Sequence, residues 1–126
     1  MTTAARHRTV PDAVRRAARS CVENRAENVV ILDLHGVADM TDYFVIASGT
    51  SDTHVRALAD HVMEDLATLG QRPYHQEGLV HGRWVLLDYV DFVVHVFHPA
   101  MREFYQLERL WGDARVVPVG AHGASA

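Results

Sequence analysis

The sequence has a single cysteine and no long apolar run, and each of these absences excludes a class of protein. Cys21 alone can form neither an internal disulfide nor a metal site built from several cysteines. No segment approaches the roughly 18 consecutive apolar residues of a membrane-spanning helix, and the N-terminus lacks the apolar stretch of a signal peptide. We therefore expect a cytoplasmic protein, and its 126 residues suffice for one domain with its own core.

The charge balance argues against a protein that binds nucleic acid directly. Sixteen acidic residues outweigh twelve basic ones, all of them arginine, and the net charge is −4 at pH 7. Affinity that comes from many phosphate contacts needs a basic surface. A basic protein is a better partner for this chain, because opposite charges steer association.

Apolar periodicity predicts a single α/β domain, a mixed β-sheet covered by helices, at residues 9–119. The polar residues 1–8 and the small residues 120–126 are expected to form a mobile arm and a mobile tail. Residues spaced three and four apart predict helices at 10–22, 51–69 and 99–111. Runs of β-branched and aromatic residues predict strands at 28–34, 43–48, 83–89 and 92–97, with a short edge strand within 71–78. Residues 114–119 are expected to run along the surface.

The Gly49-Thr50-Ser51 turn leads from a predicted strand into a helix, which is the outline of an anion-binding site. Unpaired N–H groups point out of a helix start and suit a phosphate. A nucleotidyltransferase would add closely spaced carboxylates on a strand to hold Mg²⁺, but the nearest candidates, Asp88 and Asp91, flank a predicted hairpin turn. Asp52 would also compete with a phosphate for the same N–H groups. The pattern favours a structural helix cap over a nucleotide site.

The remaining polar residues form no catalytic or metal-binding pattern. His95 and His98 are three apart in a predicted strand and so face opposite sides of the sheet, and His98 is expected to precede the last helix. Cys21 lies on the apolar stripe of the first helix and is expected to be an inert core thiol. We predict a protein that is not an enzyme, with no catalytic residue, no cofactor and no metal.

The segment "RWVLLDY" at residues 83–89 is the most informative part of the predicted sheet. Side chains alternate along a strand, so Trp84, Leu86 and Asp88 share one face. Val85, Leu87 and Tyr89 share the other face and are typical of a core. The neighbouring strand "DFVVHVF" is apolar on both faces, which leaves one face free to meet something other than the helices of this domain. A tryptophan such as Trp84, with an acidic residue such as Asp88 on the same face of the strand, is typical of a protein-binding hot spot.

Three blocks of the sequence closely resemble the ribosomal silencing factor family, also called RsfS or Iojap. They are "DYFVIASGTSDTHVRALAD", "EGLVHGRWVLLDYVDFVVHVFH" and "REFYQLERLWGD", and the resemblance extends over roughly residues 10–119. Each block is weakly specific by itself, whereas the ordered combination is far more specific.

The resemblance implies a nucleotidyltransferase-like α/β fold in a family not regarded as catalytic. It implies a translational repressor that binds the large ribosomal subunit through ribosomal protein number fourteen. Such a protein sterically blocks joining of the small subunit and slows protein synthesis under nutrient limitation. The partner-binding residues that it implies are Trp84, Leu86 and Asp88 on the sheet, and Glu108, Arg109 and Trp111 in the last block.

Two alternatives stay open at this point. A divergent nucleotidyltransferase-like enzyme would need carboxylates at metal distance near Gly49, and a dimeric adaptor would need only exposed apolar faces. The apolar strands and the self-association of the family also predict a homodimer when the protein is free.

Overall fold

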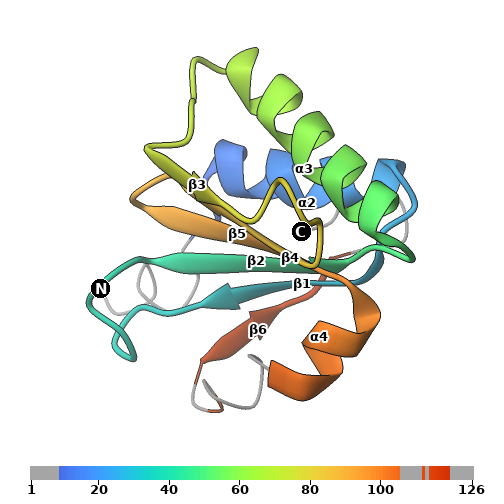
Figure 1. The fold of residues 1–126 in the computed structure, drawn as a ribbon. Helices are drawn as coiled ribbons and strands as arrows, with labels where there is room; N and C mark the ends of the chain where they lie inside the picture. Colours follow the sequence, from blue (N-terminus) through green and yellow to red (C-terminus); the bar gives the residue numbers. More distant parts are fainter. Residues whose placement is uncertain (1–8, 106–111, 113, 120–126) are drawn as a thin grey trace.

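The computed structural model describes residues 9–105, 112 and 114–119 (Figure 1). Its helices are α2 (Asp12–Glu23), α3 (Asp52–Ala67) and α4 (Pro99–Tyr105). Its strands are β1 (Glu27–Asp33), β2 (Tyr43–Ser48), β3 (His75–Glu77), β4 (Trp84–Asp88), β5 (Phe92–Phe97) and β6 (Arg115–Val117). They form one sheet in the order β3-β4-β5-β2-β1-β6, in which β2 and β5 are parallel and the other described neighbours are antiparallel. The predicted mixed α/β sheet is confirmed.

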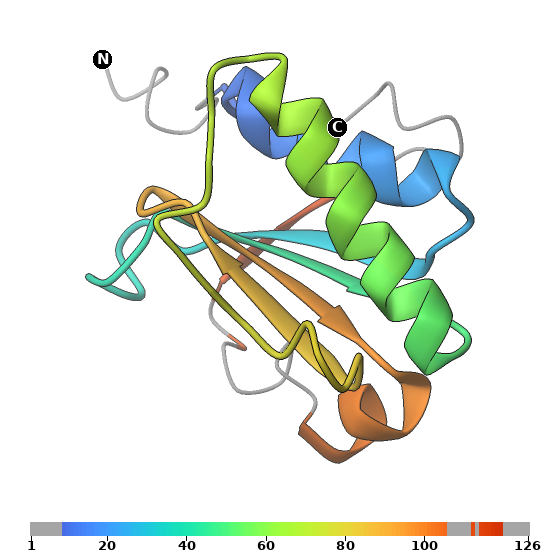
Figure 2. The same ribbon diagram turned by 45° about the horizontal axis from the view of Figure 1, so that its top comes forward.

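Helices α2 and α3 lie on one face of the sheet, and α4 lies on the other (Figures 1 and 2). Each long helix buries one apolar stripe against the strands. The buried apolar residues are Val14, Ala17, Ala18 and Cys21 of α2, and Val55, Leu58, Ala59, Val62 and Leu66 of α3. Cys21 is fully buried, as its place on the apolar stripe predicts, and burial raises the pKa of its thiol to about 12, which disfavours the reactive thiolate. Among the described helices, none combines the length and the apolar character needed to cross a membrane.

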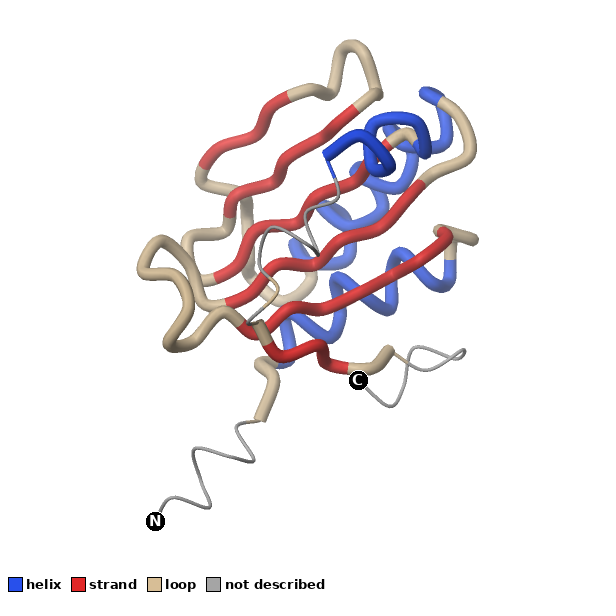
Figure 3. Tube along the Cα trace, turned by 90° about the horizontal axis from the view of Figure 1, so that it is seen from below, coloured by secondary structure: helices blue, strands red, loops and turns tan. Residues whose placement is uncertain are grey.

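The face opposite α2 and α3, which we call the outer face, carries a second and smaller apolar cluster. Its buried members are Leu32, Leu34, Phe44, Ile46 and Phe97. Helix α4 covers one end of this face, and its Met101 packs against the cluster. Figure 3 looks onto the outer face and shows no described helix in front of most of β3 and β4. At this edge the outer-face side chains Trp84, Leu86 and Asp88 are half-buried.

Within residues 114–119, which were expected only to run along the surface, the structure shows a strand, β6, that pairs with β1 at the edge of the sheet. Arg115 Nη2 donates a hydrogen bond to Asp33 Oδ2 at 2.9 Å across this pair. Burial by itself raises the pKa of Asp33, but hydrogen bonds from His35 and Arg115 outweigh that effect and hold the pKa below its usual range. A strand of three residues has too few alternations to be recognised from its sequence.

Helix α3 ends at Ala67 rather than at the predicted Leu69, which is exposed. Gly70 has a φ of 77°, and the N–H of Gln71 donates to the Leu66 carbonyl at 2.9 Å. The left-handed glycine cap predicted from the sequence is therefore present.

The hairpin between β4 and β5 turns at a residue that is poorly suited to its backbone. Val90 has a φ of 74°, and the N–H of Asp91 donates to the Tyr89 carbonyl at 2.9 Å. A β-branched residue in this left-handed region costs roughly 1–2 kcal/mol. We expect Val90→Asn to raise the free energy of unfolding by about 0.5–1 kcal/mol in urea denaturation, because asparagine tolerates this conformation.

Val80→Asn is the matched control for this substitution. Val80 is more exposed than Val90, at 83% against 57%, and does not have a positive φ. An equal gain in stability from both substitutions would contradict the explanation based on the backbone of Val90.

Candidate protein-binding surface

Alternate residues of β4 point to opposite faces of the sheet, as the sequence predicts. Val85 and Leu87 are fully buried toward α2 and α3. Trp84, Leu86 and Asp88 lie on the outer face and are each half-buried. The predicted separation of the two sets is confirmed, while a role of the outer set in partner binding stays a prediction.

The outer-face residues of β4 join a residue of β5 to form what we call the β4 surface. It consists of Trp84, Leu86, Asp88 and Val93. The exposed residues His75 and Glu77 of β3 pair with Asp88 and Leu86, so they form a rim along the same face. An apolar centre with a polar rim is the usual arrangement of a protein interface. The carboxylates of Asp88 and Glu77 suit a basic partner.

Within the sheet, Trp84 contacts Phe97 and His95. Its indole stacks on Phe97 with ring centroids 5.1 Å apart and an interplanar angle of 25°. Its Nε1–H donates a hydrogen bond to Nδ1 of His95 at 3.1 Å. The side chain is therefore ordered before any partner binds, which reduces the conformational entropy lost on binding.

His95 lies beneath the β4 surface and has no counterpart among the site residues expected from the sequence. It is 4% exposed, and burial lowers its pKa to about 4, so the ring is neutral at pH 7. Because Nδ1 accepts the indole hydrogen bond, the ring proton is on Nε2. Within the described residues Nε2 is buried without a hydrogen-bond partner, and such a donor typically costs about 1–3 kcal/mol.

Asp88 has a structural role besides its place on the β4 surface. Its Oδ1 accepts a hydrogen bond from the N–H of Val90 at 2.8 Å, which helps to close the hairpin. A substitution of Asp88 would therefore change the turn as well as the surface. Leu86 is a cleaner position at which to test the surface.

The second predicted group of partner-binding residues, Glu108, Arg109 and Trp111, lies outside the described residues. The helix that leads toward it, α4, contains a residue that the sequence analysis missed. Arg102 is 7% exposed, and its guanidinium donates to the Asn28 carbonyl and to Ser48 Oγ. An arginine in an amphipathic helix is ordinarily expected at the surface, so no signal in the sequence pointed to this role.

The Gly49 turn is occupied by the protein's own hydrogen bonds. The N–H of Gly49 donates to the Phe97 carbonyl, and the N–H of Thr50 donates to Nδ1 of His54, each at 2.9 Å. Ser51 Oγ accepts from the N–H of His54 at 3.1 Å and is the predicted helix cap. The opposite ring nitrogen of His54 donates to the Asn24 carbonyl at the end of α2. The turn therefore joins two helices to the sheet, and these donors are already used.

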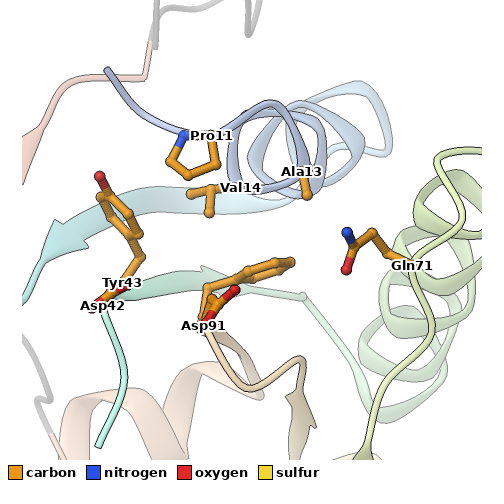
Figure 4. A pocket seen from close by; sticks show the side chains of 8 residues that line it. Pro11, Ala13, Val14, Asp42, Tyr43, Gln71 and Asp91 are labelled. Carbon is orange, nitrogen blue, oxygen red and sulfur yellow. The ribbon is translucent and has the colours of Figure 1, made fainter. Parts of the chain in front are cut away.

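A hollow of about 210 Å³ lies between the start of α2 and the first residues of β2 and β5 (Figure 4). Its lining is Pro11, Ala13, Val14, Asp42, Tyr43, Gln71, Asp91 and Phe92. Nε2 of His35 lies 3.4 Å from the Asp42 carboxylate, but the lining contains no serine or cysteine that such a pair could activate as a nucleophile. Within the described residues, no group of three or more potential metal ligands is present there or elsewhere.

Comparison with known proteins identifies the family. The sequence matches the family described as "Ribosomal silencing factor during starvation" over residues 7–125. This chain belongs to the ribosomal silencing factor family.

Members of the family and a solved structure agree with this assignment. The ribosomal silencing factor RsfS of Bacillus subtilis is 44% identical over 98 residues, which cover 78% of this chain and 83% of that protein. A mouse protein named "Mitochondrial assembly of ribosomal large subunit protein 1" is 34% identical over 71% of this chain and 40% of its own length. The crystal structure of a Chromobacterium violaceum protein, 33% identical, superposes with a TM-score of 0.78 over 80% of this chain and 84% of that chain.

Membership of the ribosomal silencing factor family confirms the resemblance noted in the sequence. The family description names a regulatory role rather than a reaction, which fits a protein that is not an enzyme. The nucleotidyltransferase-like classification, the domain limits and the partner-binding residues stay predictions.

Proposed function

We propose that this protein is a non-enzymatic silencer of translation that binds the large ribosomal subunit. The observation that carries the proposal is the family match over residues 7–125. The names of relatives support it, since one is a ribosomal silencing factor and another is named for assembly of the ribosomal large subunit in mitochondria. The bound protein blocks joining of the small subunit and slows protein synthesis when nutrients are limited.

The β4 surface is the proposed contact with the ribosome. It combines Trp84, a residue type enriched in interface hot spots, with the apolar side chains of Leu86 and Val93. The proposed partner is ribosomal protein number fourteen, on the face of the large subunit that meets the small one. The net charge of −4 and the carboxylates of Asp88 and Glu77 suit a basic ribosomal protein. A homodimer of the free protein stays part of the proposal, because an open apolar surface favours self-association.

Silencing of this kind requires no bond to be made or broken. A bound protein that overlaps the docking face of the small subunit competes with it by mass action. The fraction of subunits kept apart then depends on the concentration of the silencer relative to its dissociation constant. The internal use of the Gly49 turn supports this reading, because the N–H groups of Gly49, Thr50 and His54 already donate within the fold.

Co-sedimentation with purified bacterial ribosomal subunits tests the proposal. The protein is incubated separately with large and with small subunits and centrifuged, and we expect it to sediment with the large subunits alone. Adding it to a mixture of both subunits should reduce the joined ribosome in a sucrose gradient in proportion to the protein bound. Equal sedimentation with small subunits, or binding that leaves subunit joining unchanged, would contradict the proposal.

A further inference from the structure

We infer that His95 is a positioning residue for Trp84. His95 accepts the hydrogen bond of the indole N–H, so Trp84 meets a partner through its apolar ring rather than through that N–H. The inference deepens the proposed function and rests on it for its binding measurement. His95 lies beneath the β4 surface, so it acts through Trp84 rather than by contact with the partner.

The register of the β4–β5 pair makes Trp84 and His95 diagonal neighbours. Trp84 is opposite Phe97, and His95 is opposite Leu86 on the same face. The hydrogen bond to His95 Nδ1, at 3.1 Å, holds the edge of the indole, while stacking on Phe97 holds its plane. Both contacts favour the observed conformation of the side chain.

The surroundings of His95 make it an acceptor at neutral pH. Phe44 meets the imidazole edge to face at 4.6 Å between centroids, and Phe97 stacks on it at 6.0 Å. These apolar neighbours disfavour the charged ring, whose pKa falls to about 4. A protonated ring would have no lone pair for the indole, so burial maintains the hydrogen bond.

The imidazole is a poor choice for stability alone. Its Nε2–H is buried without an acceptor among the described residues, and a half-satisfied polar group is less favourable than an apolar side chain of similar size. A leucine at this position would bury no unpaired donor. Leucine, however, has no acceptor for the indole N–H of Trp84. The geometry points to this acceptor, Nδ1, as the contribution of His95.

This arrangement restricts what a partner can place against Trp84. A carbonyl or carboxylate would find the indole N–H already used, whereas an aliphatic or guanidinium group packs on the ring without needing it. The β4 surface therefore selects an apolar or cationic group at this point. Of these two, the nearby carboxylates of Asp88 and Glu77 favour the cationic group.

The test is a double-mutant cycle on binding to purified bacterial large subunits, with wild type, His95→Leu, Trp84→Phe and the double variant. His95→Leu should weaken binding about 3- to 10-fold, as expected for one hydrogen bond, without lowering the melting temperature. In the Trp84→Phe background, which lacks the indole N–H, the same change should alter binding by less than about 2-fold. His95→Asn, whose Oδ1 accepts in place of Nδ1, should recover most of the affinity. Equal weakening in both backgrounds would overturn the inference.

Hydrogen exchange of the indole N–H gives a second readout that does not depend on the ribosome. The Trp84 signal is the one missing from the spectrum of Trp84→Phe, and it should exchange at least about 10-fold faster in His95→Leu than in wild type. Unchanged exchange means that His95 does not hold Trp84, and the inference then fails. If the indole N–H exchanges faster in His95→Leu but Trp84→Ala still binds large subunits fully, the proposed docking surface is wrong, whereas the contact between His95 and Trp84 is confirmed.

Discussion

Trp84→Ala is expected to weaken binding to large ribosomal subunits by roughly 30- to 1000-fold, the effect of losing about 2–4 kcal/mol at an interface tryptophan. Trp84 carries the largest apolar side chain of the β4 surface, and His95 and Phe97 already hold it in place. The affinity is measured by titrating large subunits against a fixed amount of protein and quantifying the sedimented fraction.

The same substitution has a smaller effect on folding. Trp84 is half-buried, so we expect a loss of about 1–2 kcal/mol in the free energy of unfolding rather than the roughly 3–5 kcal/mol of a fully buried tryptophan. Part of that loss comes from His95, whose Nδ1 is left without its donor. Circular dichroism and urea denaturation should show a folded variant at the temperature of the binding assay.

A pair of leucine variants separates binding from folding at this surface. Leu86→Asp places a charge on the half-buried β4 surface and should weaken binding by at least about tenfold. Leu69→Asp makes the same change at an exposed leucine after α3 and should leave binding unchanged. If Trp84→Ala and Leu86→Asp both bind normally, the contact lies elsewhere, and the block from Glu108 to Trp111 is next in line. If Trp84→Ala and Leu86→Asp both melt far below wild type, Trp84 and Leu86 belong to the core rather than to a binding surface.

Arg102→Met is expected to lower the free energy of unfolding by about 2–4 kcal/mol and the melting temperature by roughly 6–20 °C. Arg102 is buried and donates to the Asn28 carbonyl and to Ser48 Oγ, so one side chain ties α4 to the ends of β1 and β2. Methionine retains an apolar stem of similar length but leaves these acceptors without their donor. Thermal and urea unfolding, monitored by circular dichroism, measure the loss.

Arg83→Met is the matched control, because Arg83 is exposed immediately before β4. Its effect on the free energy of unfolding should stay within about 0.5 kcal/mol. Similar losses from the two variants would show that the buried hydrogen bonds of Arg102 contribute little.

The sequence by itself determined the features that depend on neighbouring residues along the chain. Period-two alternation in β4 separated Val85 and Leu87 from Trp84 and Leu86, and the structure confirms that separation. Helical spacing placed Cys21 in the core. The Ser51 cap and the left-handed Gly70 followed from local backbone chemistry. Each of these features is governed by contacts within a few residues, so a short window contains its cause.

Only the tertiary structure decided which distant residues meet. Strand β6 exists because Arg115–Val117 finds the free edge of β1, and its Arg115–Asp33 pair joins residues 82 apart. The bond between Trp84 and His95 depends on the register of two strands, which alternation alone does not specify. Arg102 is buried because Asn28 and Ser48, far away in the sequence, supply acceptors at the sheet end. Alternation and periodicity state which face a side chain occupies, whereas burial of a polar group depends on partners that only the assembled sheet brings within hydrogen-bond distance.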